Sequence, residues 1–252
     1  MNGSSRSIAI KKNIIASLFL KSISILVSLQ VVPLTINYIN PTRYGIWLTL
    51  SSIVAWLSYF DLGFAHGFRN RFAEAVAKGD MQLAREYVST TYVVLSLLFS
   101  GVFLIAIVVN HFVDWSAILN VDAAYSSELN IVFGILAFFF CLNIVASIFT
   151  TMLTANQKPA LASLIQTLGQ VFGFICIYVL TKTVPGNLDV LAFAFSGVPC
   201  FLLIIISIGM FLSGRYRHLS PSFHFVHFSL TKKIVGLGGQ FFIIMISMLF
   251  VF

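Results

Sequence analysis

The chain has 252 residues, of which 59% are hydrophobic and only 9% are charged, and its formal net charge is +7. Soluble domains carry about 25% charged residues, so this composition excludes an ordinary soluble protein and predicts one that crosses a membrane several times. The positive charge is then explained by membrane topology and contact with anionic lipids, and nucleic-acid binding is not expected.

Seven apolar runs are long enough to cross a hydrocarbon core of about 30 Å as helices, which takes about 20 residues each. Each run is continuously apolar, whereas barrel strands are about 10 residues long and alternate in polarity. The sequence therefore predicts an all-α, polytopic membrane helical bundle. Its spans are expected at residues 13–37, 44–64, 88–109, 129–154, 159–181, 188–212 and 234–252.

Lysine and arginine are divided unevenly between the two sides that these spans define. Twelve of the 15 flank the same side as the N-terminus, and only Arg43 and Lys182 flank the other; Lys21 lies inside the first span. Short cytoplasmic loops carry the excess of Lys and Arg in membrane proteins. The N-terminus is therefore predicted to be cytoplasmic.

The loops are short, so no separate soluble domain is predicted. Lys11-Lys12 introduces the first span and Lys232-Lys233 introduces the seventh, which suggests an internal repeat of a kind that transporters often use. On this interpretation residues 1–213 form a six-helix lobe, 214–233 a cytoplasmic linker and 234–252 the first helix of a second lobe. The chain is then expected to be the first part of a longer protein.

The end of the second span carries charge where a lipid-facing helix should be apolar. Asp61 closes this span, and Arg69, Asn70 and Arg71 follow it. Asp61 either couples transport to a proton or cation, or pairs with Arg69 or Arg71 to form a cytoplasmic gate. Its place at the end of the span favours the gate.

The longest cytoplasmic connection is predicted to contain a short amphipathic helix at residues 69–78. Gly79 is placed to end that helix, because glycine tolerates the left-handed conformation after a helix C-terminus. Asp80 is placed to cap the next helix, which is expected to run straight into the span at 88–109.

Several spans carry their polar residues as a stripe along one face, at about 100° per residue. Such stripes either hydrogen-bond neighbouring helices together or line a hydrated cavity, and three of them in one bundle favour the cavity. The stripes are Asn13, Ser17, Lys21, Ser24, Ser28 and Thr35 in the first span; Asn143, Ser147, Thr150 and Thr154 in the fourth; and Pro159, Ser163, Gln166, Gln170 and Gly173 in the fifth.

Lys21 is the most distinctive residue of the first stripe. It lies nine residues beyond Lys12, or about 13 Å deeper along a continuous helix. It is either an interfacial residue whose stem reaches back to the headgroups or a positive charge inside the cavity. The cavity interpretation makes it a contact for an anionic substrate group such as a phosphate.

The sequence offers little for catalysis or cofactor binding. It contains no nucleotide-binding loop, no catalytic triad pattern and no zinc spacing, and Cys141, Cys176 and Cys200 fall in three different spans. His224 and His227 have metal-ligand spacing but no acid or cysteine beside them. We therefore expect no enzymatic activity, no cofactor and no metal site.

In several short motifs the chain resembles the polysaccharide biosynthesis (O-antigen flippase) family of the multidrug/oligosaccharidyl-lipid/polysaccharide exporter superfamily. The resemblance is moderately specific in one block and weaker in a second, shorter piece. The first block consists of Tyr44-Gly45-Ile46-Trp47, Asp61-Leu62-Gly63-Phe64, Gly67-Phe68-Arg69-Asn70-Arg71, Ala73-Glu74-Ala75 and Lys78-Gly79-Asp80, and the second is Asn156-Gln157-Lys158-Pro159.

The resemblance implies two six-helix lobes around a central cavity, of which this chain covers the first lobe and the start of the second. It further implies translocation of an undecaprenyl-pyrophosphate-linked oligosaccharide from the cytoplasmic to the outer leaflet of the bacterial inner membrane, for O-antigen, lipopolysaccharide or capsule synthesis. A coupling proton or cation, membrane lipids and the polysaccharide polymerase machinery are the further partners that this assignment allows.

Within this assignment the residues divide into two groups. Substrate contacts are expected from Lys21, Ser24, Ser28, Arg43, Asn143, Gln166 and Gln170, and headgroup capture at the gate from Asp61, Arg69, Asn70 and Arg71. Two alternatives stay open: a cation-coupled multidrug or organic-cation antiporter of the same superfamily, and a non-transporting membrane scaffold for a glycan polymerase.

Overall fold

The computed structural model describes residues 3–56, 63–236 and 239. Within these residues the protein is helical and has no strand, which confirms the all-α prediction. Five helical segments are long and apolar enough to cross a membrane, so the multi-pass prediction is also confirmed. These segments are Asn13–Ile39, Met81–Phe112, Ala123–Ala155, Pro159–Thr183 and Leu188–Leu212.

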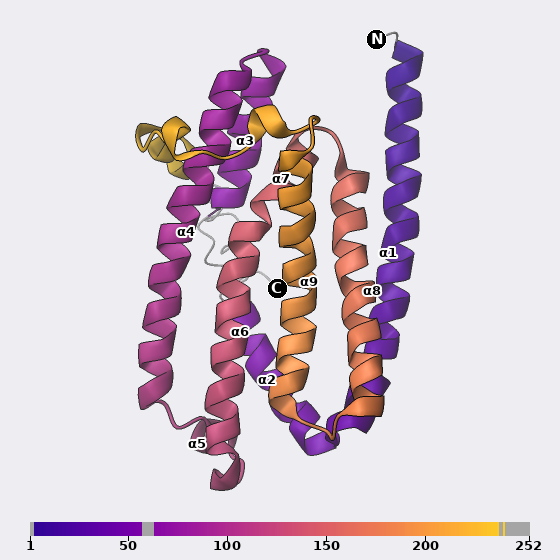
Figure 1. Cartoon of the computed structure of the whole chain (residues 1–252), viewed down its shortest axis with the longest axis vertical. Helices are drawn as coiled ribbons and strands as arrows, with labels where there is room; N and C mark the ends of the chain where they lie inside the picture. The colour runs from indigo at the N-terminus through magenta and orange to yellow at the C-terminus, as the bar shows by residue number, and fades with distance from the viewer. Residues whose placement is uncertain (1–2, 57–62, 237–238, 240–252) are drawn as a thin grey trace, which may run out of the picture.

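The helices lie side by side along one long axis (Figure 1). The long ones are α1 (Gly3–Ile39), α4 (Met81–Phe112), α6 (Ser126–Ala146), α8 (Pro159–Thr183) and α9 (Leu188–Leu212). Shorter helices are α2 (Pro41–Trp56), α3 (Phe64–Ala77), α5 (Trp115–Leu119) and α7 (Ile148–Ala155), with single 3₁₀ turns η2 (Ala123–Tyr125), η3 (Arg217–Leu219) and η4 (Phe223–Phe225).

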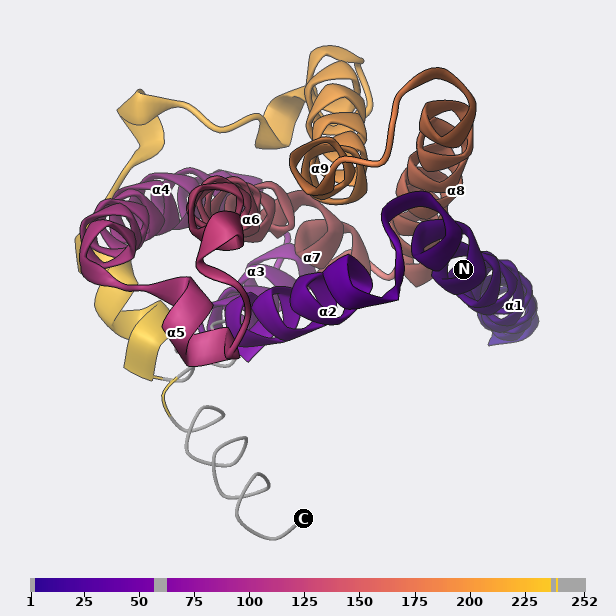
Figure 2. The same ribbon diagram turned by 90° about the horizontal axis from the view of Figure 1, so that it is seen from below.

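Helix α8 is the element that joins the two sides of the bundle. It packs against α1 on one side and α9 on the other, while α9 packs on α6 and α6 on α4. Helices α2, α3 and α7 lie across from this row, as the view along the bundle axis shows (Figure 2). The N-terminus and α3 therefore lie at one end, and α5 and the α8–α9 turn at the other.

Two predicted segments need correction, and a third is described only in part. The second span was predicted to reach residue 64, but Gly63 adopts a left-handed conformation with φ 68° and α3 begins at Phe64. The amphipathic helix predicted at 69–78 consequently starts five residues early. Residues 229–236 of the linker and the seventh span are helical, and the rest of that span lies outside the described residues.

The predicted turn after α3 is confirmed in detail. Gly79 has φ +77°, a conformation that costs glycine nothing and other residues roughly 1–2 kcal/mol. The Asp80 carboxylate accepts a hydrogen bond from the Leu83 amide at 2.9 Å and so caps α4. From this cap α4 continues without a break to Phe112.

The fourth predicted span, 129–154, is interrupted at Ser147 between α6 and α7. The Ser147 hydroxyl donates to the Ile144 carbonyl at 2.7 Å, and the Ser147 carbonyl accepts the hydroxyls of Thr150 and Thr151 at 2.9 and 3.0 Å. Hydroxyl groups that bond back to the preceding turn bend membrane helices. The hydroxyl residues Ser147, Thr150 and Thr151 therefore bend the chain between α6 and α7, and α7 packs against α3 and α8.

Small residues let α6, α8 and α9 approach closely. A Cβ at Gly169 of α8 would lie 3.2 Å from the Cα and Cβ of Pro199, and a Cβ at Gly197 of α9 would lie 2.8 Å from the ring of Phe139. Lipid tails are as apolar as the side chains, so tight packing of this kind is what drives helices together in a bilayer. The row α6–α9–α8 is therefore the rigid wall of the bundle.

The α8–α9 turn is fitted against the end of α1. A Cβ at Gly186 would collide with the carbonyl oxygen of Tyr38, whereas a Cβ at Gly209 on α9 would meet nothing within 4 Å. Backbone cannot move aside as a flexible side chain can. Only glycine fits at position 186 without a shift of the chain.

We therefore expect Gly186→Ala to lower the free energy of unfolding by about 1–3 kcal/mol. Since about 1 kcal/mol shifts the midpoint by roughly 2–4 °C in a protein of this size, the effect should be visible in thermal unfolding of the detergent-purified protein. Gly209→Ala is the matched control and should leave the midpoint unchanged or slightly raised. Equal midpoints for both variants would contradict this packing.

Candidate functional site

A polar hollow of about 360 Å³ lies where α3, α7 and α8 meet. We call it the α3–α8 hollow. Its lining combines one cation with amide, hydroxyl and imidazole groups, and no carboxylate contributes to it within the part of the chain that the structure describes. The lining residues are Ala65, His66, Arg69, Thr150, Thr151, Thr154, Pro159, Ala162, Ser163 and Gln166.

Arg69 is positioned by the buried face of α3. Phe64, Phe68 and Phe72 recur at four-residue spacing, are all buried and pack into the core of this end of the bundle. This arrangement turns the neighbouring face, which carries Ala65 and Arg69, toward the hollow. Arg69 is exposed and has no hydrogen-bond or ion-pair partner among the described residues.

The other wall of the hollow is built from two predicted stripes. Thr150 and Thr154 of α7 face Ser163 and Gln166 of α8 across it. The two threonine hydroxyls donate to carbonyls of their own helix, at 2.9 Å each. Their oxygen lone pairs are left as acceptors, while the exposed Gln166 amide offers both donors and an acceptor.

A larger cavity of about 470 Å³ follows along α8, and we call it the α1–α8 cavity. It lies between α1, α2, α8 and α9, and most of its wall is apolar. Its polar groups are few: Ser28, Thr35, Tyr44 and Gln170. The Ser24 hydroxyl donates to the Gln170 side-chain oxygen and so fixes α1 to α8 beside this cavity.

Lys21 lines neither the α3–α8 hollow nor the α1–α8 cavity. It is exposed on α1 between two contacts with α8, namely the Thr167 hydroxyl donating to the Leu20 carbonyl at 3.4 Å and the Ser24–Gln170 bond. At 100° per residue it lies within about 20° of Ser28, which does line the cavity. It therefore sits at the level where the hollow gives way to the cavity.

The depth of Lys21 also follows from the packing of α1 on α8. Asn13 of α1 contacts the Gln157 carbonyl just before α8 begins, at 3.5 Å. Lys21 is eight residues further along the same helix, or about 12 Å. The Lys21 side chain therefore leaves α1 well beyond the level at which α8 begins. Among the described residues no carboxylate lies within ion-pair distance of it.

Asn143 lies in a third hollow of about 270 Å³ between α2, α6 and α9. Ser51, Ser196 and several aromatic rings share this lining. This hollow shares Trp47, Phe195 and Pro199 with the α1–α8 cavity. Asn143 thus lies next to that cavity but does not line it with Gln170, nor the α3–α8 hollow with Gln166, although the sequence had grouped the three as substrate contacts. Its predicted role stays a prediction.

The remaining residues of the predicted gate behave differently from Arg69. Arg71 donates to Glu74 at 3.0 Å and to the Lys233 carbonyl at 3.4 Å. Hydrogen bonds from Lys78, and then from Arg71, hold the pKa of the Glu74 carboxyl below its ordinary value. Asn70 is exposed on α3, and Asp61 lies outside the described residues.

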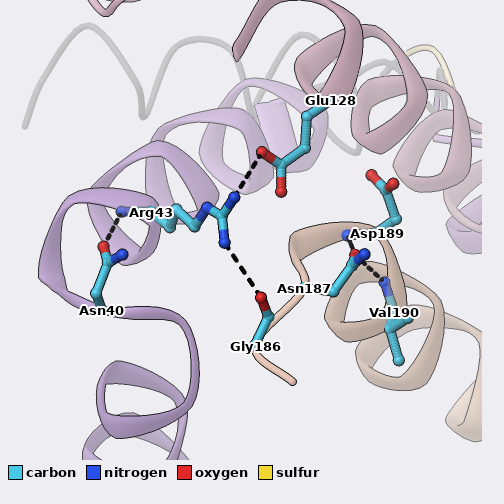
Figure 3. Close-up of polar contacts among 7 residues, drawn as sticks. All are labelled: Asn40, Arg43, Glu128, Gly186, Asn187, Asp189 and Val190. Carbon is cyan, nitrogen blue, oxygen red and sulfur yellow. Dashed lines mark hydrogen bonds and ion pairs between the residues drawn. The ribbon is translucent and has the colours of Figure 1, made fainter. Parts of the chain in front are cut away.

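Arg43 ties three helix ends together at the far end of the bundle (Figure 3). Its guanidinium donates to the Glu128 carboxylate of α6 at 3.3 Å and to the Gly186 carbonyl of the α8–α9 turn at 3.1 Å. Its own backbone amide donates to the Asn40 side chain at 3.0 Å. These bonds favour a structural role for Arg43 over the predicted substrate contact.

The Arg43–Glu128 pair was missed in the sequence. Arg43 was one of only two cations predicted on its side of the membrane, and Glu128 directly precedes the predicted span at 129–154 on that side, which was a usable signal. The same close-up shows Asn187 capping α9 through the amides of Asp189 and Val190, at 2.7 and 3.2 Å (Figure 3). The end of the bundle away from Arg69 is thus held by hydrogen bonds between helix ends and within the α9 cap.

Comparison with known proteins adds nothing to this geometry. No family model matches the chain, and no curated protein and no solved structure matches it significantly. Over the described residues no group of three or more His, Cys, Asp or Glu could hold a metal ion. The three cysteines are free thiols.

The Arg43 contact can be measured with a double-mutant cycle of Arg43→Gln, Glu128→Gln and the double variant. Both side chains are more than two-thirds covered, at 29% and 19% exposure, so we expect a coupling energy of about 1 kcal/mol in the free energy of unfolding, measured by SDS titration. The exposed pair Lys78–Glu74 is the control and should couple more weakly. If the losses of unfolding free energy at Arg43 and Glu128 are strictly additive, the two side chains do not interact, and the proposed contact (the Arg43 clamp) is contradicted.

Proposed function

We propose that the protein translocates a lipid-linked oligosaccharide across the bacterial inner membrane. The carrier is undecaprenyl pyrophosphate, and movement is from the cytoplasmic to the outer leaflet, by alternating access. The observation that carries this proposal is the α3–α8 hollow, which presents an arginine without a described partner among hydroxyl and amide groups. An arginine in a hollow whose described lining contains no carboxylate is suited to bind an anion.

The chemistry of the hollow fits a pyrophosphate joined to a sugar. A guanidinium offers several donors in a fixed fork and bonds two phosphate oxygens at once. Gln166, Ser163 and the acceptor lone pairs of Thr154 suit sugar hydroxyls, which both donate and accept. A volume of about 360 Å³ lies in the range of ordinary small-ligand sites.

Helix α8 supplies a path from one end of the bundle toward the other. Gln166 lines the α3–α8 hollow and Gln170, one turn on, lines the α1–α8 cavity. Lys21 projects from α1 at the level between them. We propose that the pyrophosphate passes from Arg69 to Lys21 while the polyprenyl chain stays in lipid.

The orientation of the protein follows from its basic residues. Helix α3, which carries Arg69 and Arg71 and is followed by Lys78, and the linker lie at the end of the bundle that holds the N-terminus (Figure 1). This end is proposed to be cytoplasmic by the positive-inside rule. The hollow would then be entered from the cytoplasm, and the Arg43 clamp would close the outer end of the conformation seen here.

A drug or cation antiporter would bind positively charged substrates and therefore needs embedded carboxylates. Neither the α3–α8 hollow nor the α1–α8 cavity has one in its described lining. A scaffold without transport activity would have no use for a polar hollow of this size. The lining thus supports an anionic substrate. The coupling and gate roles of Asp61 both remain predictions.

The test is flipping of a fluorescent undecaprenyl-pyrophosphate-linked monosaccharide in liposomes that contain the full-length protein. Charge-assisted hydrogen bonds contribute about 1.5–3 kcal/mol, so Arg69→Ala and Lys21→Ala should each slow flipping by about tenfold or more. Lys182→Ala removes an exposed cation at the other end of α8 and should leave the rate unchanged.

A wild-type rate for Arg69→Ala would exclude the α3–α8 hollow as the headgroup site. A wild-type rate for Lys21→Ala alone would remove Lys21 from the path. Each variant is first compared with the unmodified protein by size-exclusion chromatography and thermal unfolding, so that a folding defect is not taken for a transport defect.

A further inference from the structure

The linker that follows α9 (residues 214–233) has a composition unlike the rest of the chain. It contains Arg215, Arg217, Lys232 and Lys233, three histidines and three phenylalanines, and no acidic residue. Basic clusters of this size beside a membrane helix bind anionic lipids. Exposing phenylalanine rings to water is unfavourable, so phenylalanines in a polar loop are expected to be covered by another surface.

The linker packs along α4 and is held there by hydrogen bonds and a cation–π contact. Arg85 donates to the Ser220 carbonyl at 2.9 Å, and its guanidinium lies 4.2 Å from the centre of the Phe225 ring. One turn deeper, the Ser222 amide donates to the Ser89 hydroxyl at 3.1 Å. Three contacts therefore hold this stretch against the first turns of α4.

A second set of contacts lies around Thr90. The His227 amide donates to the Thr90 hydroxyl at 3.0 Å, and the His227 ring lies 3.7 Å from the Glu86 carboxylate. The linker leaves the end of α9 and passes around the outside of α4 (Figure 2). It forms a band on the outer surface of the bundle.

The face of α4 that the linker covers is the same face that is exposed further along the helix. At 100° per residue, Glu86 and Thr90 share an arc of about 40° with Leu97, Leu104 and Val108. Those three apolar side chains are 64%, 64% and 59% exposed, as expected for a surface that faces lipid. Thr90 precedes Leu97 by about 10 Å, so the linker lies at the level where the hydrocarbon begins.

Two phenylalanines of this band point away from the protein. Phe225 is partly covered beneath Arg85, but Phe223 and Phe228 on either side of it are 87% and 63% exposed. Aromatic rings at the membrane boundary are stabilised by burial in the headgroup region. The lysines and arginines of the linker are exposed as well.

We propose that residues 214–233 form an interfacial belt that binds anionic lipid headgroups, with Phe223 and Phe228 inserted into the bilayer boundary. The surface continues the lipid-facing side of α4, which identifies the bilayer as its occupant. The belt joins the end of α9 to the following helix, and it holds that connection at the membrane surface. This role is independent of the transported substrate.

The test places a tryptophan at Phe223 in the full-length protein in nanodiscs and measures its quenching by lipids with brominated acyl chains. Phe223→Trp should show blue-shifted emission that brominated lipids quench, after subtraction of the signal of the three native tryptophans. Met81→Trp is the control. Met81 is 43% exposed at the start of α4, about 13 Å beyond Thr90 toward the aqueous side, and iodide in the water should quench it instead.

The headgroup preference is measured in mixed discs in which either phosphatidylglycerol or phosphatidylcholine carries the bromine. We expect phosphatidylglycerol to quench Phe223→Trp about twofold or more over phosphatidylcholine. Adding Arg215→Gln, Arg217→Gln, Lys232→Gln and Lys233→Gln should abolish this difference. Emission at Phe223→Trp that only iodide quenches, blue-shifted emission that no brominated lipid quenches, or equal quenching by both lipids would overturn the proposal.

Discussion

The close packing of α8 against α9 is the constraint on which the rest of the structure depends. Gly169 of α8 meets Pro199 of α9, and Gly197 of α9 meets the Phe139 ring of α6, so three helices pack closely into one wall. With one face of α8 committed to this wall, its polar face is left to α1, α3 and α7. The α3–α8 hollow and the α1–α8 cavity are the consequence, and every polar group proposed to contact substrate is placed relative to α8.

The cations of the bundle differ in what they contact. This difference distinguishes the side chains that hold the fold together from those proposed to bind substrate. Arg43, Arg85 and Lys158 are bonded to partners that join different segments of the chain. Arg69 and Lys21 have no ion-pair or hydrogen-bond partner among the described residues, and both lie on the side of α8 that carries its glutamines. Lys21 lies about 12 Å beyond Asn13 along α1, and keeping its charge there without a carboxylate is unfavourable unless a ligand compensates it. An anionic substrate is the compensation proposed here.

Hydropathy was sufficient to predict those helices whose length is set by the thickness of the bilayer. The bounds of α8 and α9 agree with the predicted spans within two residues, because apolar runs must match the thickness of the hydrocarbon. The end of the second span was not predictable in this way, since hydropathy does not register the left-handed turn at Gly63 that precedes α3. The Arg43–Glu128 contact joins residues 85 positions apart, and periodicity carries no information on such pairs. The polar stripes predicted which faces matter, but only the packing showed that the fourth and fifth meet around Arg69 while Asn143 lies elsewhere.

The central claim is that the α3–α8 hollow holds a pyrophosphate headgroup, and photocrosslinking tests it most directly. A benzoylphenylalanine replaces Gln166 inside the hollow or, as a control, Ile175, which is 48% exposed on the opposite face of α8. We expect the probe, a radiolabelled undecaprenyl-pyrophosphate-linked sugar, to crosslink at position 166 and not at 175, and excess undecaprenyl pyrophosphate, but not undecaprenol, to compete. Equal labelling at the two positions, or labelling at 166 that undecaprenyl pyrophosphate does not reduce, would contradict the account.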